Sequence, residues 1–397
     1  MLLACALLFI ALATLWPMPG ETQIQGLCLI CGSRGTADLL LNIMLFVPLG
    51  AALLLRGQSR RRVALWGLLL STAIELLQFY IPGRDPSVSD VLANTFGTVL
   101  GAFIAGSAGS WLSPRPLPPF GSHLSRLASA VAALICLATA LLLTPAYPDS
   151  PYFGLWTPDL SHFVPYRGRV LSATLNSEPI ADGPIHATDS VRAALQSPGG
   201  FDLEIRAIAG PRPDGLSPLF AVFDEQRREI LLLALDREDV VLRTRMRASD
   251  ARLDRPELRV AEGLWRQRSP RPGDTLSFSL VAHAGRYEIN GVRRGFTVGD
   301  GWGLLLYMQN LPFQNVVSAA WIAALFLPAA FWARTRADGI MITLAVLAGL
   351  AIVPALTAVQ HTPPVQWLAV ALGIGSGVVL QRFHRLRGGS RWLAVGP

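Results

Sequence analysis

The sequence predicts a polytopic α-helical membrane protein of about eight spans that carries an external all-β sandwich domain. Three observations support this class. Of the 397 residues, 51% are hydrophobic and 15% are charged, whereas a soluble globular domain carries about 25% charged residues. The apolar residues gather in runs of the length that a bilayer requires. Between the fifth and sixth runs lie about 165 residues of alternating hydrophobicity, enough to bury a core of their own.

The predicted spans are eight apolar runs separated by short polar loops. The first is short and lacks a basic leading segment, so it is either a weak signal peptide or a signal anchor. The eight runs are Leu2–Trp16, Leu39–Leu55, Val63–Ile81, Val91–Leu112, Leu124–Leu143, Val316–Ala333, Ile340–Val359 and Val365–Leu380.

Arginine orients these spans, and the chain contains no lysine. Most arginines near the spans fall in alternate loops and in the tail, and short cytoplasmic loops are enriched in such residues. The pattern therefore predicts a protein of the bacterial cytoplasmic (inner) membrane with both termini in the cytoplasm. The orienting residues are Arg56, Arg60, Arg61, Arg62, Arg115, Arg126, Arg334, Arg336, Arg382, Arg385, Arg387 and Arg391.

The predicted domains are a transmembrane bundle of five spans (1–145), an external β-domain (146–312) and a C-terminal segment of three spans with a basic tail (313–397). In the middle domain, stretches such as "FDLEIRAIA" and "TLSFSLVAH" alternate with period two and are interrupted by Gly, Pro and Asp. This pattern is typical of antiparallel strands. The pair Asn290-Gly291 between two such stretches predicts a two-residue hairpin turn.

Polar side chains inside or beside three predicted spans form a candidate site. An intramembrane carboxylate such as Glu75 costs about 2.5 kcal/mol or more and points to function by default. We expect Arg84, just past the end of the same helix, to be its counter-ion. The candidate polar site comprises Asp38, Asn42, Glu75, Gln78, Arg84, Asp90 and Asn94.

A structural interpretation of these residues stays open. Asp38 and Asp90 suit the N-termini of helices, where a carboxylate satisfies free N–H groups and complements the dipole. The amide side chains suit hydrogen bonds between helices.

The same three segments resemble the VanZ-like family of bacterial membrane proteins over about residues 38–103. The family pattern is Asn-x-x-x-Phe-x-Pro-x-Gly, then Glu-x-x-Gln with an Arg-containing turn, then Asp-x-x-x-Asn-x-x-Gly. The resemblance implies an envelope protein linked to glycopeptide tolerance, a form of antibiotic resistance. The matching positions are Asn42, Phe46, Pro48, Gly50, Glu75, Gln78, Pro82, Gly83, Arg84, Asp90, Asn94 and Gly97.

The β-domain resembles the concanavalin A-like, laminin-G-like jelly roll of lectins and glucanases over about residues 172–308. Tyr287, Asn290 and Gly291 match the Tyr-x-x-Asn-Gly pattern of a late hairpin in that family. The resemblance implies binding of glycans or proteins. The Glu-x-Asp-x-x-Glu spacing of the related hydrolases is absent from the sequence, so hydrolysis is disfavoured.

Two further patterns are candidate features of the external side. Arg243, Arg245 and Arg247 alternate with other residues, which places them on one face of a strand. That face is either a solvated surface or an anion-binding stripe. Cys28 and Cys31 lie in the first predicted external loop and are a disulfide candidate.

The leading functional hypothesis is non-enzymatic recognition of an envelope glycan or lipid-linked precursor by the external domain, in contact with membrane lipids. The alternative is a membrane-embedded enzyme that acts on a lipid or lipid-linked headgroup, with Glu75 as general base and Arg84 holding an anion. We expect no cofactor and no metal, because the histidines and cysteines lack metal-ligand spacing. We expect no nucleic-acid partner, because the arginines are not clustered on one domain.

Overall fold

The computed structural model describes residues 1–17, 34–84, 86–111, 118–160, 163–197, 199–260, 270–283, 285–307 and 311–390. These residues form two compact units. The N-terminal unit comprises Met1–His123, Ala251–Asp254 and Val379–Pro397, and the C-terminal unit comprises Leu124–Asp250 and Arg255–Val378.

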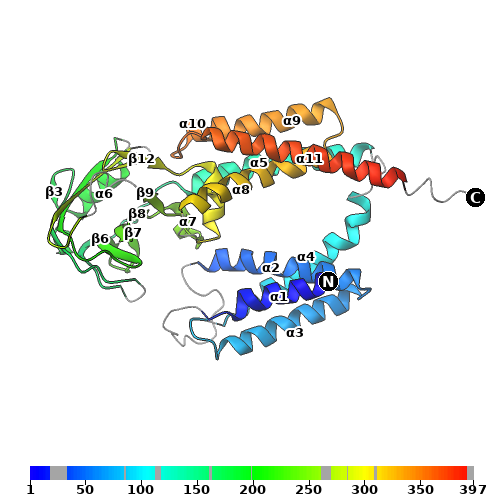
Figure 1. The fold of residues 1–397 in the computed structure, drawn as a ribbon, viewed down its shortest axis with the longest axis horizontal. Helices are drawn as coiled ribbons and strands as arrows, with labels where there is room; N and C mark the ends of the chain where they lie inside the picture. The colour runs from blue at the N-terminus through cyan, green and yellow to red at the C-terminus, as the bar shows by residue number, and fades with distance from the viewer. Residues whose placement is uncertain are drawn as a thin grey trace, which may run out of the picture. The chain divides into compact units, whose positions relative to one another are not determined.

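Among the described residues, four helices make up most of the N-terminal unit, and its core is aliphatic and aromatic (Figure 1). Ile10, Phe46 and Ile74 come from three of these helices and pack together. Glycines of the second helix (Gly35–Leu55) face the backbone of the fourth (Val88–Trp111), and glycines of the fourth face the backbone of the second. These two helices therefore run in close contact. The four helices are α1 (Leu2–Leu15), α2 (Gly35–Leu55), α3 (Arg60–Gln78) and α4 (Val88–Trp111).

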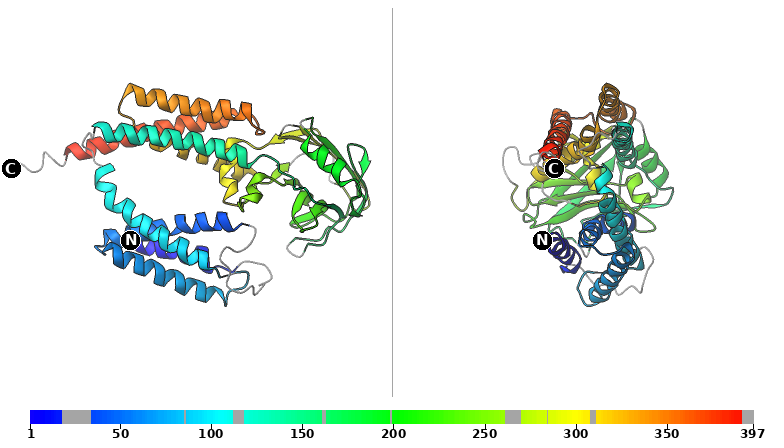
Figure 2. Two further views of the ribbon diagram at one scale, coloured as in Figure 1. Left: turned by 180° about the vertical axis from the view of Figure 1, so that it is seen from behind. Right: turned by 90° about the vertical axis from the view of Figure 1, so that its right-hand side faces the viewer.

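The long apolar helices of the C-terminal unit lie side by side in the views of Figures 1 and 2. The predicted span Leu124–Leu143, which was assigned to the first domain, is one of these helices and belongs to the C-terminal unit. Ser125 donates to the carbonyl of Ala329 at 2.8 Å, and Arg126 pairs with Asp338 at 3.2 Å. These polar groups have partners within the C-terminal unit, which is why this helix packs there. The helices are α5 (Pro118–Leu142), α8 (Leu311–Trp332), α9 (Arg336–Leu347), which continues through η2 (Ala348–Ile352) into α10 (Val353–Leu356), and α11 (Pro364–Ser390).

Six helices within the described residues are long and apolar enough to cross a membrane. The prediction of about eight spans is therefore not confirmed. Helix α1 has 14 residues, which extend about 21 Å and fall short of a hydrocarbon core about 30 Å thick. Helix α3 begins with three arginines and contains Glu75, so its mean hydropathy is lower than that of the six candidate spans. The six segments are Gly35–Leu55, Val88–Ala108, Gly121–Leu142, Phe313–Trp332, Arg336–Leu356 and Pro364–Arg385.

The predicted β-domain contains two antiparallel six-stranded sheets in a sandwich-like arrangement. The sheets meet where Tyr287 of one lies 3.4 Å from Thr244 of the other, measured between their hydroxyl oxygens. The first sheet has the order β4 (Gly183–Pro184), β1 (Tyr152–Trp156), β6 (Leu216–Asp224), β7 (Glu229–Asp236), β8 (Asp239–Thr244), β9 (Leu258–Val260). The second has the order β12 (Val292–Gly295), β11 (Arg286–Ile289), β10 (Thr275–His283), β5 (Phe201–Ile208), β2 (Arg169–Leu175), β3 (Glu178–Pro179).

The two sheets differ in how far their sequences alternate. In β5, alternate side chains are buried and exposed, as period two predicts. In β7, nearly every side chain is buried. Phe163, from the segment after β1, packs against the cluster that contains Leu232 and Val241. This cover explains why the central strands of the first sheet are apolar on both faces. Two short helices complete the domain, α6 (Thr188–Gln196) and α7 (Arg247–Asp250).

The hairpin turn predicted at Asn290-Gly291 is confirmed. Ile289 of β11 pairs with Val292 of β12, so the loop has two residues. Asn290 has φ +49° and Gly291 has φ +80°, as expected where a hairpin requires left-handed backbone at both loop positions. The Asn290 side chain also accepts from the N–H of Ser279 at 2.8 Å, which ties the turn to β10.

We expect Gly291→Val to lower the free energy of unfolding by about 1–2 kcal/mol, because a side chain at positive φ collides with its own backbone. Thermal unfolding of the full-length protein in detergent, followed by the β-sheet circular dichroism signal, measures the change. The control is Arg293→Ala. Arg293 is 86% exposed and pairs with Glu288 at the surface, where such pairs contribute little. Equal unfolding temperatures for the two variants would contradict the strained-turn interpretation.

Candidate functional site

The polar residues predicted in the N-terminal unit lie on facing helices. Glu75 on α3 is 7% exposed, and its carboxylate accepts from the N–H of Ser87 at 2.8 Å. Asn94 on α4 donates to the hydroxyl of Ser71 on α3, also at 2.8 Å. Gln78 donates to the carbonyl of Thr14 on α1 at 2.9 Å. These contacts join α3 to α4 and to α1.

The carboxylates of this group also lie near one another. Asp90 accepts hydrogen bonds from Asn42 on α2 and from Ser89. Its negative charge is close enough to those of Glu75 and Asp38 for each pair to repel. The structure therefore places residues of α2, α3 and α4 in one polar cluster, as their spacing predicts.

Arg84 has a different role from the one expected. Its guanidinium donates to the carbonyl of Ala13 at 2.7 Å and to that of Trp16 at 3.1 and 3.2 Å. The last carbonyls of a helix lack partners within the helix, and a cation suits that end of its dipole. Arg84 thus caps the C-terminus of α1, and no ion pair between it and Glu75 occurs among the described residues.

The contacts favour the structural interpretation for several of these residues. Gln78 and Asn94 each use a side-chain amide to join two helices, as expected for polar contacts between membrane helices. Glu75 differs, since the hydrogen bond described for its buried carboxylate comes from one backbone N–H. It remains the candidate for chemistry in this cluster.

The predicted arginine stripe does not form. Strand β8 ends at Thr244, so the alternation of a strand stops before Arg245. Arg243 pairs with Glu257 and lies over the ring of Phe163, while Arg245 is buried and pairs with Asp250 at 2.5 Å. Two of the three guanidinium groups are thus neutralised, and Arg247 begins the short helix α7.

The other sequence candidates are not brought together. Cys28 and Cys31 lie outside the described residues. Of the remaining cysteines, Cys5 is exposed on α1 and Cys136 is buried in α5. Among the described residues, no group of three or more His, Cys, Asp or Glu side chains is arranged to hold a metal ion.

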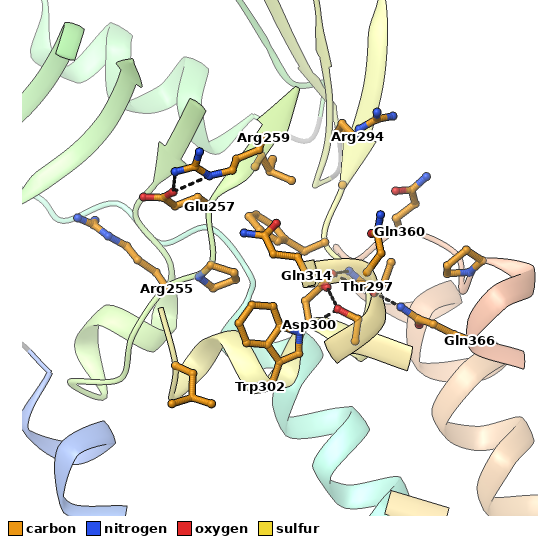
Figure 3. A pocket seen from close by; sticks show the side chains of 18 of the residues that line it. Arg255, Glu257, Arg259, Arg294, Thr297, Asp300, Trp302, Gln314, Gln360 and Gln366 are labelled. Atoms are coloured by element: carbon orange, nitrogen blue, oxygen red, sulfur yellow. Dashed lines mark hydrogen bonds and ion pairs between the residues drawn. The ribbon is translucent and has the colours of Figure 1, made fainter. Parts of the chain in front are cut away.

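A pocket of about 360 Å³ lies within the C-terminal unit, where the β-domain joins the membrane helices (Figure 3). Its walls come from four segments: the chain leading into β9, the end of β12 with the following 3₁₀ helix η1 (Val298–Leu304), the first turns of α8, and the start of α11 with the loop before it. The amide, guanidinium and aromatic side chains that line it include Arg255, Arg259, Arg294, Trp302, Tyr307, Gln314, Asn315, Gln360 and Gln366.

A buried hydrogen-bond network fixes the floor of this pocket. Asp300 accepts from the backbone N–H and the hydroxyl of Thr297, at 2.7 and 2.9 Å, and from the hydroxyl of Ser318 at 2.7 Å. Ser318 in turn accepts from the indole N–H of Trp302 at 2.9 Å. Burial raises the pKa of Asp300, whereas the hydrogen bonds from Thr297 and Ser318 oppose that shift. The network binds η1 to α8.

Charged residues on the sandwich side of the pocket neutralise one another. Arg259 is 3% exposed. It pairs with Asp236 at 2.7 Å and with Glu257 at 2.9 Å. Glu257 also accepts from Arg243. Arg255 pairs with Glu229 at 2.9 Å. This wall is built from satisfied ion pairs.

Sequence reasoning missed the pocket because its walls come from segments separated by up to about a hundred residues. A local signal was present: Gln314 and Asn315 lie just before the predicted span Val316–Ala333, and Gln366 lies in the first turn of the predicted span Val365–Leu380. Polar side chains at that depth face either protein or a cavity.

Comparison with protein families identifies a match in the N-terminal part of the chain. Residues 4–109 match a family model described as VanZ/LLP1, which supports a VanZ-like domain in that part of the chain. The match covers α1 to α4 and does not extend over the β-domain. Searches of curated proteins and of solved structures returned no match.

Proposed function

We propose that this protein is a multi-pass protein of the bacterial inner membrane that binds an envelope ligand, a glycan or a lipid-linked component, outside the membrane. The observation that carries the proposal is the pocket where the β-domain joins α8 and α11. Ligand sites are typically concave, measure about 300–1,000 Å³ and combine apolar walls with a few polar groups. The pocket, at about 360 Å³ and lined by amides, arginines, Trp302 and Tyr307, has these properties.

The proposed external location rests on the arginine distribution. Arg334 lies between α8 and α9 and Arg336 begins α9, at the opposite end of α8 from the pocket. Since such short loops are enriched in arginine on the cytoplasmic side, the pocket faces outward. The two antiparallel sheets support a lectin-like, concanavalin-type assignment of the domain, which is part of the proposal.

The VanZ-like domain gives the proposal its physiological setting. By that likeness, we propose that ligand binding contributes to glycopeptide tolerance or to the response to envelope stress. The two units then have separate tasks: α1 to α4 supply the VanZ-like bundle, and the β-domain with its helices supplies recognition.

A second candidate function is catalysis on a lipid headgroup with Glu75 as the base. The observation in its favour is the burial of Glu75, whose carboxylate has no ion-pair partner among the described residues. A general base must reach the proton that it removes, and Glu75 is only 7% exposed. Arg84, the partner expected to hold an anion, is bound to the end of α1. Binding is therefore the better-supported function.

We expect Asn315→Trp to reduce ligand retention about tenfold, because a bulky ring at this lining position fills the pocket. The full-length protein is purified into nanodiscs made from a bacterial lipid extract, and bound molecules are identified by native mass spectrometry. Val316→Trp is the matched control, since Val316 is the next residue of α8, is 64% exposed and does not line the pocket. Equal retention by both variants, or no retained molecule in the wild type, would contradict the proposal.

A further inference from the structure

Gln366 at the start of α11 has a side-chain orientation fixed by its neighbours. The hydroxyl of Thr297 donates its single hydrogen to Asp300 at 2.9 Å. Thr297 can then only accept from Gln366, and the Gln366 amide N–H₂ group meets it at 2.7 Å. The amide oxygen of Gln366 must therefore point away from Thr297.

That amide oxygen is buried and has no hydrogen-bond partner among the described residues. Gln366 is 3% exposed and lines the pocket. Leaving a buried acceptor unpaired costs about 1–3 kcal/mol, so a donor supplied from the pocket is favoured. A hydroxyl or N–H group of a bound molecule would supply that donor.

The pocket also favours a negative charge. Arg294 lines it and is exposed. Its guanidinium donates to the backbone carbonyl of Arg293 at 3.1 Å and has no carboxylate partner among the ion pairs of the described residues. Helices α8 and α11 both begin at the pocket, and the N-terminus of a helix carries partial positive charge. The two carboxylates that line the pocket already have partners: Glu257 pairs with Arg243 and Arg259, and Asp300 accepts from Thr297 and Ser318. A cationic ligand, such as one that brings an ammonium group to Gln366, would therefore meet the positive groups and be repelled. An anion beside a neutral hydroxyl donor fits both observations.

The surroundings of the pocket are apolar. Leu306 and Val365 line it and are 46% and 52% exposed. Phe313, in the first turn of α8, is 61% exposed. Exposed apolar residues on candidate membrane spans suit acyl chains, while the amides and Arg294 suit a headgroup. This combination points to an amphiphile.

We propose that the pocket binds the headgroup of an anionic lipid that carries free hydroxyl groups, with Arg294 contacting its phosphate and Gln366 accepting from a hydroxyl. The inference rests on the proposed function and narrows its ligand to one chemical class. A polyol or a sugar joined to the lipid through a phosphate has both features.

The test separates the phosphate from the hydroxyl groups. Full-length protein in phosphatidylcholine nanodiscs is given one of three lipids: phosphatidylglycerol (phosphate and hydroxyls), phosphatidic acid (phosphate without a polyol) or monoglucosyl diacylglycerol (hydroxyls without phosphate). Native mass spectrometry measures the fraction of protein that retains each lipid. We expect phosphatidylglycerol to bind about tenfold more tightly than either of the others, since each lacks one recognised group.

Two variants assign the contacts. Arg294→Gln is expected to abolish the preference for phosphatidylglycerol over the glucosyl lipid. Gln366→Met is expected to abolish the preference over phosphatidic acid and to leave the first preference intact. Arg293→Gln, the neighbouring exposed arginine outside the pocket, is expected to change neither. If Gln366→Met fails to fold, Arg294→Gln and the three-lipid comparison still show whether the phosphate and the hydroxyl groups are both recognised.

The outcomes distinguish this inference from the proposed function. Retention of all three lipids to the same extent, still blocked by Asn315→Trp, would overturn the headgroup assignment and leave the binding function standing. Absence of any retained ligand, both here and from the lipid extract, would overturn both. If free glycerol phosphate displaces bound phosphatidylglycerol as effectively as added phosphatidylglycerol does, the lipid assignment is overturned, because the acyl chains then contribute nothing to binding.

Discussion

Gly97→Ala is expected to separate α4 from α2 and to lower the free energy of unfolding of the N-terminal unit by about 3 kcal/mol, the upper end of overpacking costs. A methyl group at Gly97 would overlap the backbone carbonyl of Ile43 on α2. Gly50 and Gly101 face backbone of the opposite helix in the same way, at Thr98 and Val47. A backbone group cannot rotate aside as a side chain does, so the helices must move apart and lose contact along their length.

The matched control for this prediction is Gly106→Ala in the same helix. A methyl group there would lie 3.2 Å from the ends of the Arg60 and Leu54 side chains, which are flexible. We expect this variant to be neutral or to gain stability from the better helix propensity of alanine, worth up to about 1 kcal/mol. Unfolding of both proteins by denaturant titration in micelles measures the difference. Similar stability of the two variants would show that α2 and α4 are not in close contact.

Arg259→Met is expected to lower the free energy of unfolding by about 3–5 kcal/mol, the cost of removing one partner from a buried ion pair. Asp236 and Glu257 are 8% and 6% exposed, so neither carboxylate can recover its hydration when the guanidinium is removed. Arg259→Lys keeps the charge but loses the planar fork that reaches both carboxylates. We expect it to fall between the wild type and the methionine variant.

Arg212→Met is the control for the buried arginine. Arg212 pairs with Glu238 at 2.8 Å, but the two side chains are 60% and 53% exposed. Exposed pairs contribute about 0–1 kcal/mol, so little change is expected. Thermal unfolding of the full-length variants, followed by the β-sheet signal, compares them. A loss at Arg259 no larger than that at Arg212 would show that the buried pairs do not stabilise the sandwich.

Local patterns account for the parts of the fold that the sequence predicts well. The turn at Asn290-Gly291 is specified by two adjacent residues that tolerate left-handed backbone. The strand β5 alternates because one of its faces is buried. The polar cluster follows from helical spacing, since residues three or four apart share a face.

The features that the sequence does not reveal depend on distant partners. Arg84 was expected beside Glu75, nine residues away, but it binds Ala13 and Trp16, about 70 residues earlier. Nothing in its own segment identifies these carbonyls as the acceptors. The arginine stripe fails for a local reason, because strand β8 stops at Thr244, and alternation alone does not show where a strand ends. The pocket depends on how the β-domain packs against α8 and α11. No single stretch of the sequence predicts that packing.

The pocket's construction from late segments has a consequence for the order of biogenesis. Every strand of the β-domain lies before Leu311, so both sheets can form while the later helices are still being synthesised, and domains generally fold in order from the N-terminus. Ser318 joins the floor of the pocket only with α8, and Gln366 only with α11. A nascent chain therefore carries the folded sheets before the pocket is complete. On the binding function proposed above, ligand binding begins only when the last helix is in place.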